Sequence, residues 1–226
     1  MTHVTRLPAL VSLNQLTYQF ANGETLLDAL TLSFDRLPTA IVGRNGMGKS
    51  LLLRLIAGEL QPSSGSLNCA ASLAYVPQDP LPAPQQTVAQ VAGVAETLRA
   101  LQRLAAGNAD PEDLLRVDDR WDLAERLRQS LDEAGLQHLE PDHPAANLSG
   151  GQLARVVLVG ALLSDAELLL LDEPSNHLDR AGRRWLMEQL RHWRGGLILV
   201  SHDRQLLMQV QRIVELSPQG AQVYGG

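Results

Sequence analysis

The chain of 226 residues contains one cysteine, few aromatic residues and no long apolar run. The single cysteine, Cys69, cannot form an internal disulfide, which favours a reducing compartment. No stretch approaches the roughly 18 consecutive apolar residues that a membrane-spanning helix needs, and residues 1–15 do not resemble a signal peptide. The formal charge of −6 gives no overall attraction to nucleic acid or acidic lipid. Composition therefore predicts a globular cytoplasmic protein without direct membrane insertion.

Lysine is almost absent: the chain has 18 arginines but one lysine, Lys49. This lysine lies in GRNGMGKS, residues 43–50, which fits the pattern G-x-x-x-x-G-K-[ST] without a mismatch. An apolar run at residues 39–43 precedes the pattern, and a leucine-rich helix is expected over residues 50–60. Glycines let backbone N–H groups surround a phosphate, and the helix N-terminus attracts the same anion. The segment predicts a phosphate-binding loop in which Lys49 reaches the outer phosphates and the Ser50 hydroxyl binds Mg²⁺. The alternative is a chance glycine turn with a solvated lysine.

The remaining pattern alternates strands and helices. Residues 10–42 predict an antiparallel meander. A short strand is expected at residues 72–78, and two helices at 88–106 and 121–139 are expected to be joined by an acidic turn. Later helices are expected at residues 149–163, 181–193 and 205–212, with strands at 167–171 and 195–203. This order predicts an α/β fold with a mostly parallel sheet, an N-terminal antiparallel β subdomain and an inserted helical subdomain. The β subdomain and core are expected at about residues 1–87 and 164–226, and the helical subdomain at about 88–163.

Two carboxylates end the apolar run LLLLDEP at residues 168–174. Asp172 is placed to hold a Mg²⁺ coordination shell. Glu173 faces the opposite way and is the candidate to orient or deprotonate an attacking water. The alternative is a strand that ends in ordinary surface acids.

A second anion site is indicated by LSGGQ at residues 148–152, where Ser149, Gly150 and Gly151 begin a predicted helix. Exposed N–H groups, a hydroxyl and the helix dipole together bind anions. A second phosphate site in one chain has a use if it serves a nucleotide held by another domain. Alternatively, Ser149 is only a helix N-cap.

Five segments of the chain, by their order and spacing, resemble the nucleotide-binding domain of the ABC ATPase superfamily. They are GRNGMGKS, YVPQD, LSGGQ, LLLLDEPSNHLD and VSHDR. The resemblance covers essentially the whole chain and implies a RecA-like core that binds ATP and Mg²⁺ and hydrolyses ATP. It implies catalysis by Glu173, His202 and Lys49, and Mg²⁺ binding by Ser50, Gln78 and Asp172. It also implies that Ser175–Asp179 lie across a dimer. The implied nucleotide-binding residues are Phe20, Gly43, Arg44, Asn45, Gly46, Met47, Gly48, Lys49, Ser50, Leu51, Gln78, Ser149, Gly150, Gly151, Gln152 and Asp179.

For two of these residues, the sequence leaves a second interpretation open. Phe20 is at the position of the family's adenine-stacking aromatic, with Tyr18 as second choice; both are also compatible with ordinary strand core residues. His202 follows an apolar strand, where a histidine taken alone is more often a cap or a solvated residue.

Within the superfamily, DEPSNHLD and LILVSHDRQLL resemble the ABC-F branch, soluble proteins with two such domains in one chain. This resemblance implies a second nucleotide-binding domain as a partner, from the same full-length chain or a homodimer. It also implies ribosome or ribosomal RNA binding, in translation or antibiotic resistance. With one set of motifs, we expect the N-terminal half of such a protein, hydrolysing ATP slowly by itself.

Two other functions remain open from the sequence. One is the ATPase subunit of an ABC membrane transporter, and the other is a regulatory module in which ATP binding alone is the signal. Residues 180–212 hold seven arginines, which fits either contact with RNA phosphates or a solvated helix face.

Overall fold

The structure is a computed structural model that describes residues 8–108 and 110–225; residues 1–7, expected to carry no signal peptide, lie outside this part. By its internal contacts the chain divides into two units. We call residues 8–78, 165–175 and 190–225 the sheet unit, and the remaining described residues the helical unit.

The division differs in detail from the boundaries expected from the sequence. The first boundary falls after Gln78 rather than near residue 87. The helical unit also includes residues 176–189, which the sequence had assigned to the core.

An antiparallel three-stranded sheet of order β2-β1-β4 forms one part of the sheet unit. Its strands are β1 (Val11–Gln19), β2 (Thr25–Phe34) and β4 (Ser64–Cys69). The predicted meander supplied β1 and β2, whereas β4 was missed because its sequence is polar. A Cβ at Gly65 would lie 2.2 Å from the carbonyl oxygen of Gln15, so the close approach of β4 to β1 at this point requires glycine.

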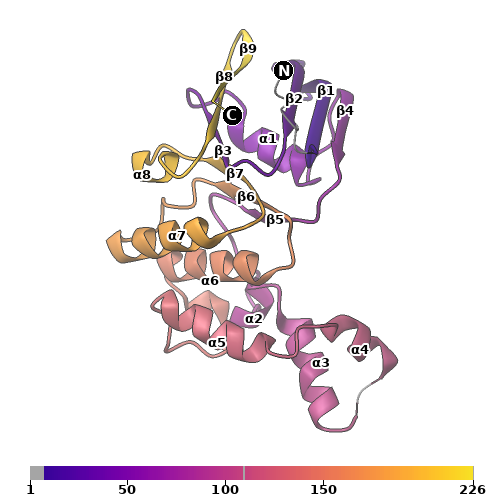
Figure 1. Ribbon diagram of the computed structural model, residues 1–226, viewed down its shortest axis with the longest axis vertical. Helices are drawn as coiled ribbons and strands as arrows, with labels where there is room; N and C mark the ends of the chain where they lie inside the picture. Colours follow the sequence, from indigo (N-terminus) through magenta and orange to yellow (C-terminus); the bar gives the residue numbers. More distant parts are fainter. Residues whose placement is uncertain (1–7, 109, 226) are drawn as a thin grey trace, which may run out of the picture. The chain divides into compact units, whose positions relative to one another are not determined.

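The second sheet has six strands in the order β5-β6-β7-β3-β8-β9; in Figure 1, β5, β6, β7 and β3 lie near the centre, and β8 and β9 extend to the top. The strands are β3 (Thr39–Val42), β5 (Leu73–Val76), β6 (Leu168–Asp172), β7 (Gly196–Val200), β8 (Arg212–Ser217) and β9 (Gly220–Gly225). All neighbouring pairs are parallel except β8 with β9. Every residue of β6 and β7 is buried, as expected for strands covered on both faces. The mostly parallel α/β fold is therefore confirmed.

Two helices belong to the sheet unit, α1 (Lys49–Ile56) and α8 (Arg204–Leu207). Leu52 and Leu53 of α1 pack with Phe34 of β2 and with residues of β6, β7 and β8 in one hydrophobic core. Helix α8 is much shorter than predicted, and β8 was missed, because Arg212 begins a strand paired with β3 rather than ending a helix.

The helical unit contains α2 (Val88–Val91), α3 (Ala95–Ala105), α4 (Pro111–Val117), α5 (Leu123–Glu133), a 3₁₀ turn (Ala145–Asn147) and α6 (Gly150–Leu163). Helix α7 (Arg180–His192) belongs to this unit as far as Gln189. The expected helix over residues 88–106 is broken at Gly93, whose φ is +71°. The expected acidic turn after α3 is largely replaced by α4, which Asp110 caps.

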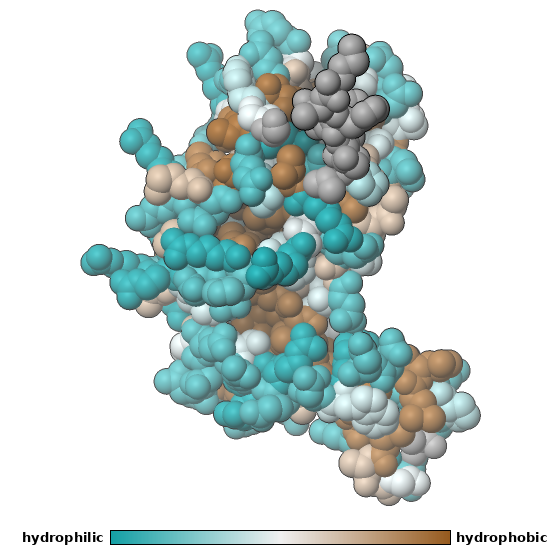
Figure 2. Space-filling model, in the orientation of Figure 1, coloured by the Kyte–Doolittle hydropathy of each residue, from teal (hydrophilic) through white to brown (hydrophobic). Residues whose placement is uncertain are grey.

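A separate hydrophobic core holds the helical unit together. It includes Leu123, Leu127 and Leu131 of α5 and Val156 and Val159 of α6. The α3–α4 part of this unit also carries exposed apolar side chains (Figure 2), and Leu114 and Leu115 of α4 are among the exposed residues. No helix in the described part of the chain is both long enough and apolar enough to span a bilayer.

Candidate active site

Three neighbouring parallel strands bring the central motifs to one edge of the large sheet. Strands β6, β7 and β3 are adjacent, and they are followed respectively by Glu173, His202 and the glycine-rich loop. The carboxyl ends of parallel strands lie at the same sheet edge, where ligands of open α/β sheets bind. The fold therefore gathers these three elements within the sheet unit.

The glycine-rich loop connects β3 to α1 and depends on its glycines. Gly46 and Gly48 both have φ of +83°, a conformation that other residues rarely adopt. A Cβ at Gly43 would lie 2.4 Å from the carbonyl oxygen of Leu216, and one at Gly48 would lie 2.9 Å from Leu27. The backbone is therefore closely packed at both ends of the loop.

Lys49 is folded into the same loop. Its Nζ donates to the carbonyl oxygens of Gly43 at 2.8 Å and Arg44 at 3.0 Å, and the residue is 8% exposed. The first turn of α1 contains no acidic residue, so its positive helix end is not neutralised there. The loop therefore presents a lysine cation and a helix N-terminus together, the arrangement that binds phosphates.

The other predicted loop residues divide between the surface and the core. Arg44, Asn45 and Gly46 are exposed, and Ser50 is partly buried in the first turn of α1. Met47 and Leu51 are partly buried and pack against the hydrophobic core.

Asp172 ends β6 and is 2% exposed. Burial and the nearby Asp172 carboxylate both raise the pKa of the Tyr75 hydroxyl well above its usual range, so Tyr75 stays protonated. Gln78 is exposed two residues after β5, the strand that pairs with β6. Both residues therefore lie at the carboxyl ends of neighbouring parallel strands.

Ser50, Gln78 and Asp172 fit the chemistry of a Mg²⁺ site. They offer a hydroxyl, an amide oxygen and a carboxylate, the hard oxygen ligands that Mg²⁺ prefers. No cluster of three or more His, Cys, Asp or Glu suited to a metal occurs in the described residues. Such a donor set leaves coordination positions for phosphate oxygens and water, which is how Mg²⁺ is held with nucleotides.

Glu173 has an unusual backbone and is held by the strand beside it. Its φ is +46°, a conformation uncommon for any residue but glycine, and its N–H donates to the carbonyl oxygen of Val200 at 2.8 Å. The backbone N–H of His202 donates to Glu173 Oε2 at 3.3 Å, and the His202 Nε2 lies 3.3 Å from Oε1. The two predicted catalytic side chains are therefore in contact. Backbone strain of this kind concentrates at functional sites.

The two aromatic candidates for adenine stacking differ in exposure. Phe20 is 40% exposed, whereas Tyr18 is packed against the core. The rings meet edge to face with their centroids 5.5 Å apart. The Phe20 ring is thus the more accessible of the two.

The LSGGQ segment begins α6 in the helical unit. The Ser149 hydroxyl accepts from the Gln152 N–H at 3.3 Å, and the Gln152 side chain accepts from the Ser149 N–H at 2.9 Å. This capping box confirms that Ser149 is an N-cap. The N–H groups of the first turn, at Gly150 and Gly151, still point out of the helix start.

Asp179 contacts its own chain at the start of α7. Its carboxylate accepts from the Gly182 N–H at 2.7 Å and from Arg155 at 2.6 Å. These contacts lower the pKa of Asp179, with the Gly182 bond the largest cause. The predicted contact of Asp179 with a nucleotide stays a prediction.

Sequence reasoning missed two side-chain contacts of the helical unit. Gln152 Nε2 lies 3.1 Å from the His138 ring, and His177 Nε2 lies 2.8 Å from Asp79 Oδ1. The latter residues are 98 positions apart. No local pattern in the sequence signals such pairings; only the fold brings them together.

Comparison with known proteins agrees with this geometry. Residues 29–176 match the family described as ABC transporter. The chain belongs to this family. As an ABC ATPase domain it has the family's ATP-binding motifs in the expected fold.

Curated relatives lie in the ABC-F branch, which confirms that resemblance. The chain is 36% identical to the energy-dependent translational throttle protein EttA of Mycobacterium tuberculosis, over 91% of this chain and 40% of that protein. It is 34% identical to the tylosin resistance ATP-binding protein TlrC of Streptomyces fradiae, over 82% of this chain and 38% of that protein. The chain thus spans about two fifths of the length of these relatives.

Solved structures share the fold. An ATP-binding subunit of an ABC transporter superposes with a TM-score of 0.76 at 21% identity, covering 96% of this chain and 90% of that one. The ATP-binding cassette MJ0796, in a dimeric post-hydrolysis state with ADP and phosphate, gives a TM-score of 0.74 at 21% identity, covering 95% and 98%.

Proposed function

We propose that this chain is the ATP-hydrolysing domain of a cytoplasmic ABC-F protein that acts on the ribosome, in translation or antibiotic resistance. The contact between Glu173 and His202, at the sheet edge that also carries the Lys49 loop, is the observation that supports hydrolysis best.

The chemistry follows from the positions of these groups. Glu173 orients or deprotonates a water for in-line attack on the γ-phosphate, and its buried carboxylate is held by His202. Lys49 exchanges its two carbonyl partners for phosphate oxygens and stabilises the developing negative charge. Ser50, Gln78 and Asp172 would hold Mg²⁺, which neutralises charge on the phosphates when bound.

The adenine ring is proposed to stack on Phe20. Its exposed face supports this choice over Tyr18, which is packed against the core. A stacked base gains affinity from aromatic contact.

A second nucleotide-binding domain is proposed to complete the site. The LSGGQ segment offers an anion site besides the Lys49 loop, and the MJ0796 structure is dimeric. Ser149, Gly150, Gly151 and Gln152 would contact the ATP held by that partner domain, with Asp179 nearby. Turnover per molecule of this chain alone would therefore be slow and would rise with protein concentration. A fast rate independent of concentration would contradict this requirement.

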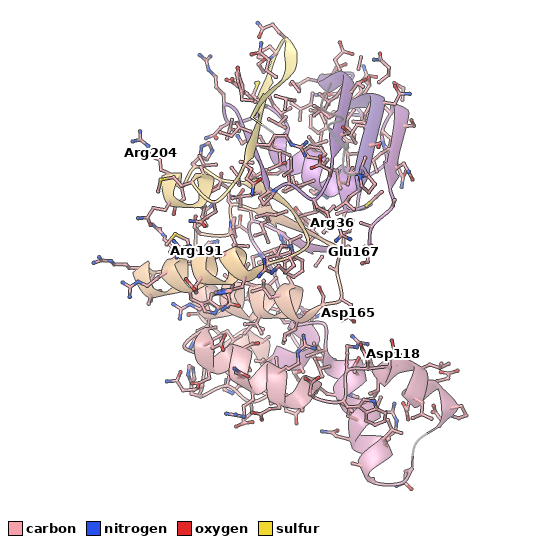
Figure 3. The ribbon with its side chains drawn as sticks, viewed as in Figure 1. Arg36, Asp118, Asp165, Glu167, Arg191 and Arg204 are labelled. Carbon is pink, nitrogen blue, oxygen red and sulfur yellow. The ribbon has the colours of Figure 1, made fainter. Side chains whose placement is uncertain are left out.

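Ribosome binding is supported by what the relatives' names state, a translational throttle and a tylosin resistance protein. Exposed arginines that would contact RNA phosphates occur in each unit: Arg180, Arg183 and Arg184 in the helical unit, and Arg191, Arg194 and Arg204 in the sheet unit. Arg191 on α7 and Arg204 at α8 lie on the same side of the sheet unit (Figure 3). Arg212 is excluded, because it is largely buried and paired with Asp35 at 3.2 Å.

The test uses the full-length protein carrying Glu173→Gln, which should bind ATP but stall before release. We expect it to sediment with ribosomes in the presence of ATP and not with membranes. Membrane association would instead identify a transporter ATPase. Failure to associate with either, while ATP is bound and hydrolysed normally by the wild type, would contradict the ribosomal function alone.

A further inference from the structure

We infer that His177 is a positioning residue that fixes the LSGGQ turn against two other segments of the helical unit. The inference rests on the proposed function, in which this turn meets the ATP of a partner domain. The LSGGQ turn is residues 148–152. The two other parts of the helical unit are Asp79 and residues 176–179, which include His177 itself.

The first link is the contact of the His177 side chain with Asp79. The Nε2 atom lies 2.8 Å from Asp79 Oδ1, and the two side chains are 41% and 65% exposed. An exposed pair of this kind adds little to folding stability. The contact joins Asp79, the residue that follows Gln78, to residues 176–179.

The second link is the close packing of His177 on the LSGGQ turn. A Cβ at Gly151 would lie 2.8 Å from the His177 carbonyl oxygen, so residue 151 must be glycine for this approach. A Cβ at Gly150 would lie 3.9 Å from the His177 Nδ1, an ordinary contact distance. Backbone and ring of His177 thus both lie against the first turn of α6.

The hydrogen bond to Asp79 also fixes the imidazole. The ring donates from Nε2–H to the carboxylate, which leaves Nδ1 as the acceptor in the neutral ring. The ring orientation set by Asp79 therefore determines which nitrogen faces Gly150.

The third link holds the far end of the same segment. Asp179 pairs with Arg155, one turn further along α6, at 2.6 Å. Arg155 also donates to the carbonyl oxygen of Ala134 at 3.1 Å. Residues 176–179 are therefore fixed along α6 at two points, His177 and Asp179.

This arrangement predicts a particular kinetic effect. The loop at residues 43–50 and Phe20 lie in the sheet unit, so the chain's own nucleotide binding does not need His177. The position of the LSGGQ turn against a second ATP does depend on His177. Small displacements of positioning groups lower the rate by up to roughly 10²-fold. Loss of His177 should lower kcat and leave the affinity of the chain's own Lys49 loop for ATP unchanged.

The experiment compares four variants of the full-length protein: His177→Phe, Asp79→Ala, the double variant, and His177→Gln. The matched control is His143→Phe, because His143 lies outside these contacts. We expect kcat to fall on the order of tenfold in His177→Phe and in Asp79→Ala, and no further in the double variant. His177→Gln, whose amide donates from a similar position, should recover most of the rate. The dissociation constant of ATP from the present chain by itself, which reports its own Lys49 loop, should stay within about twofold of the wild type in each.

Hydrogen–deuterium exchange of the amides of residues 150–153 gives a readout independent of turnover. We expect faster exchange there in His177→Phe than in the control. A His177→Phe variant that matches the control in both kcat and exchange overturns the inference, as does an additive double variant. If the wild-type protein hydrolyses no ATP, the proposed function fails. The exchange experiment then tests the inference by itself. Unchanged exchange at residues 150–153 in His177→Phe overturns the positioning role of His177, and faster exchange supports it.

Discussion

The backbone N–H of His202 and its imidazole contact different oxygens of the Glu173 carboxylate, each at 3.3 Å. The His202 ring is 60% exposed, whereas the Glu173 side chain is 10% exposed. A largely buried carboxylate is thus oriented by a residue that itself reaches solvent.

His202→Ala should therefore slow hydrolysis without preventing nucleotide binding. The variant removes the ring contact but keeps the N–H bond to Glu173, so we expect a loss of roughly tenfold to a hundredfold in kcat. Steady-state phosphate release from the full-length protein measures it, with His143→Ala as control. An unchanged rate would show that the imidazole has no part in turnover.

Lys49 is predicted to be irreplaceable by arginine. Its ammonium makes two bonds to carbonyl oxygens inside a closely packed loop, whereas a guanidinium is larger and planar. Both Lys49→Ala and Lys49→Arg should weaken ATP binding by about tenfold to a hundredfold, the effect of losing one charged hydrogen bond. Titration with a fluorescent ATP analogue measures the affinity. Wild-type affinity in Lys49→Arg would mean that the lysine does not contact phosphate.

Gly160→Ala should destabilise the helical unit. A Cβ there would lie 2.3 Å from the carbonyl oxygen of Ala92, and backbone atoms cannot move aside cheaply. We expect a loss of about 1–3 kcal/mol in the free energy of unfolding. Gly150→Ala in the same helix meets only a contact at 3.9 Å and is the control. Urea unfolding followed by circular dichroism compares them; equal midpoints would contradict the packing described for α6.

Much of this fold was predictable from local signals. The apolar runs of β3, β6 and β7, the glycine-rich loop and the start of α6 all have sequences that specify them, and the structure has them where expected. These elements carry most of the candidate site. Their sequences were therefore sufficient to indicate a phosphate-binding site, and the resemblance to the ABC ATPases identified the nucleotide as ATP.

The missed elements depend on partners far away in the chain or on signals that were overlooked. Strand β4 is polar and exists because it pairs with β1. Helix α4 does have a local signal, since Asp110 forms a capping box with Asp113 and Pro111 is the first helical residue. The contact of His177 with Asp79 has none, because it depends on how distant segments fold together.

Acid should weaken the link between α3 and α4. The Asp113 side chain is 2% exposed and accepts two hydrogen bonds from Arg103, one of them at 2.8 Å. The bond from Arg103 lowers the pKa of Asp113 below its usual value, so its stabilising effect is fully present above about pH 4. That effect is lost as the pH falls through the lowered pKa of the folded state.

Asp113→Asn tests this pH dependence. The variant should be less stable than the wild type at pH 7. The gap should narrow below about pH 4, where the Asp113 carboxylate of the unfolded chain becomes protonated before that of the folded chain. Urea midpoints between pH 7 and pH 3 measure it. A gap that is constant over this range would contradict the role of the charge.

The most direct test of the catalytic assignment is ATP turnover by the full-length protein with and without Glu173→Gln. An amide cannot accept the proton of the attacking water, so we predict a loss of roughly 10²–10⁴-fold in kcat with ATP binding retained. Turnover by Glu173→Gln at the wild-type rate would contradict the assignment of Glu173 as the catalytic base and, with it, the mechanism built on its contact with His202.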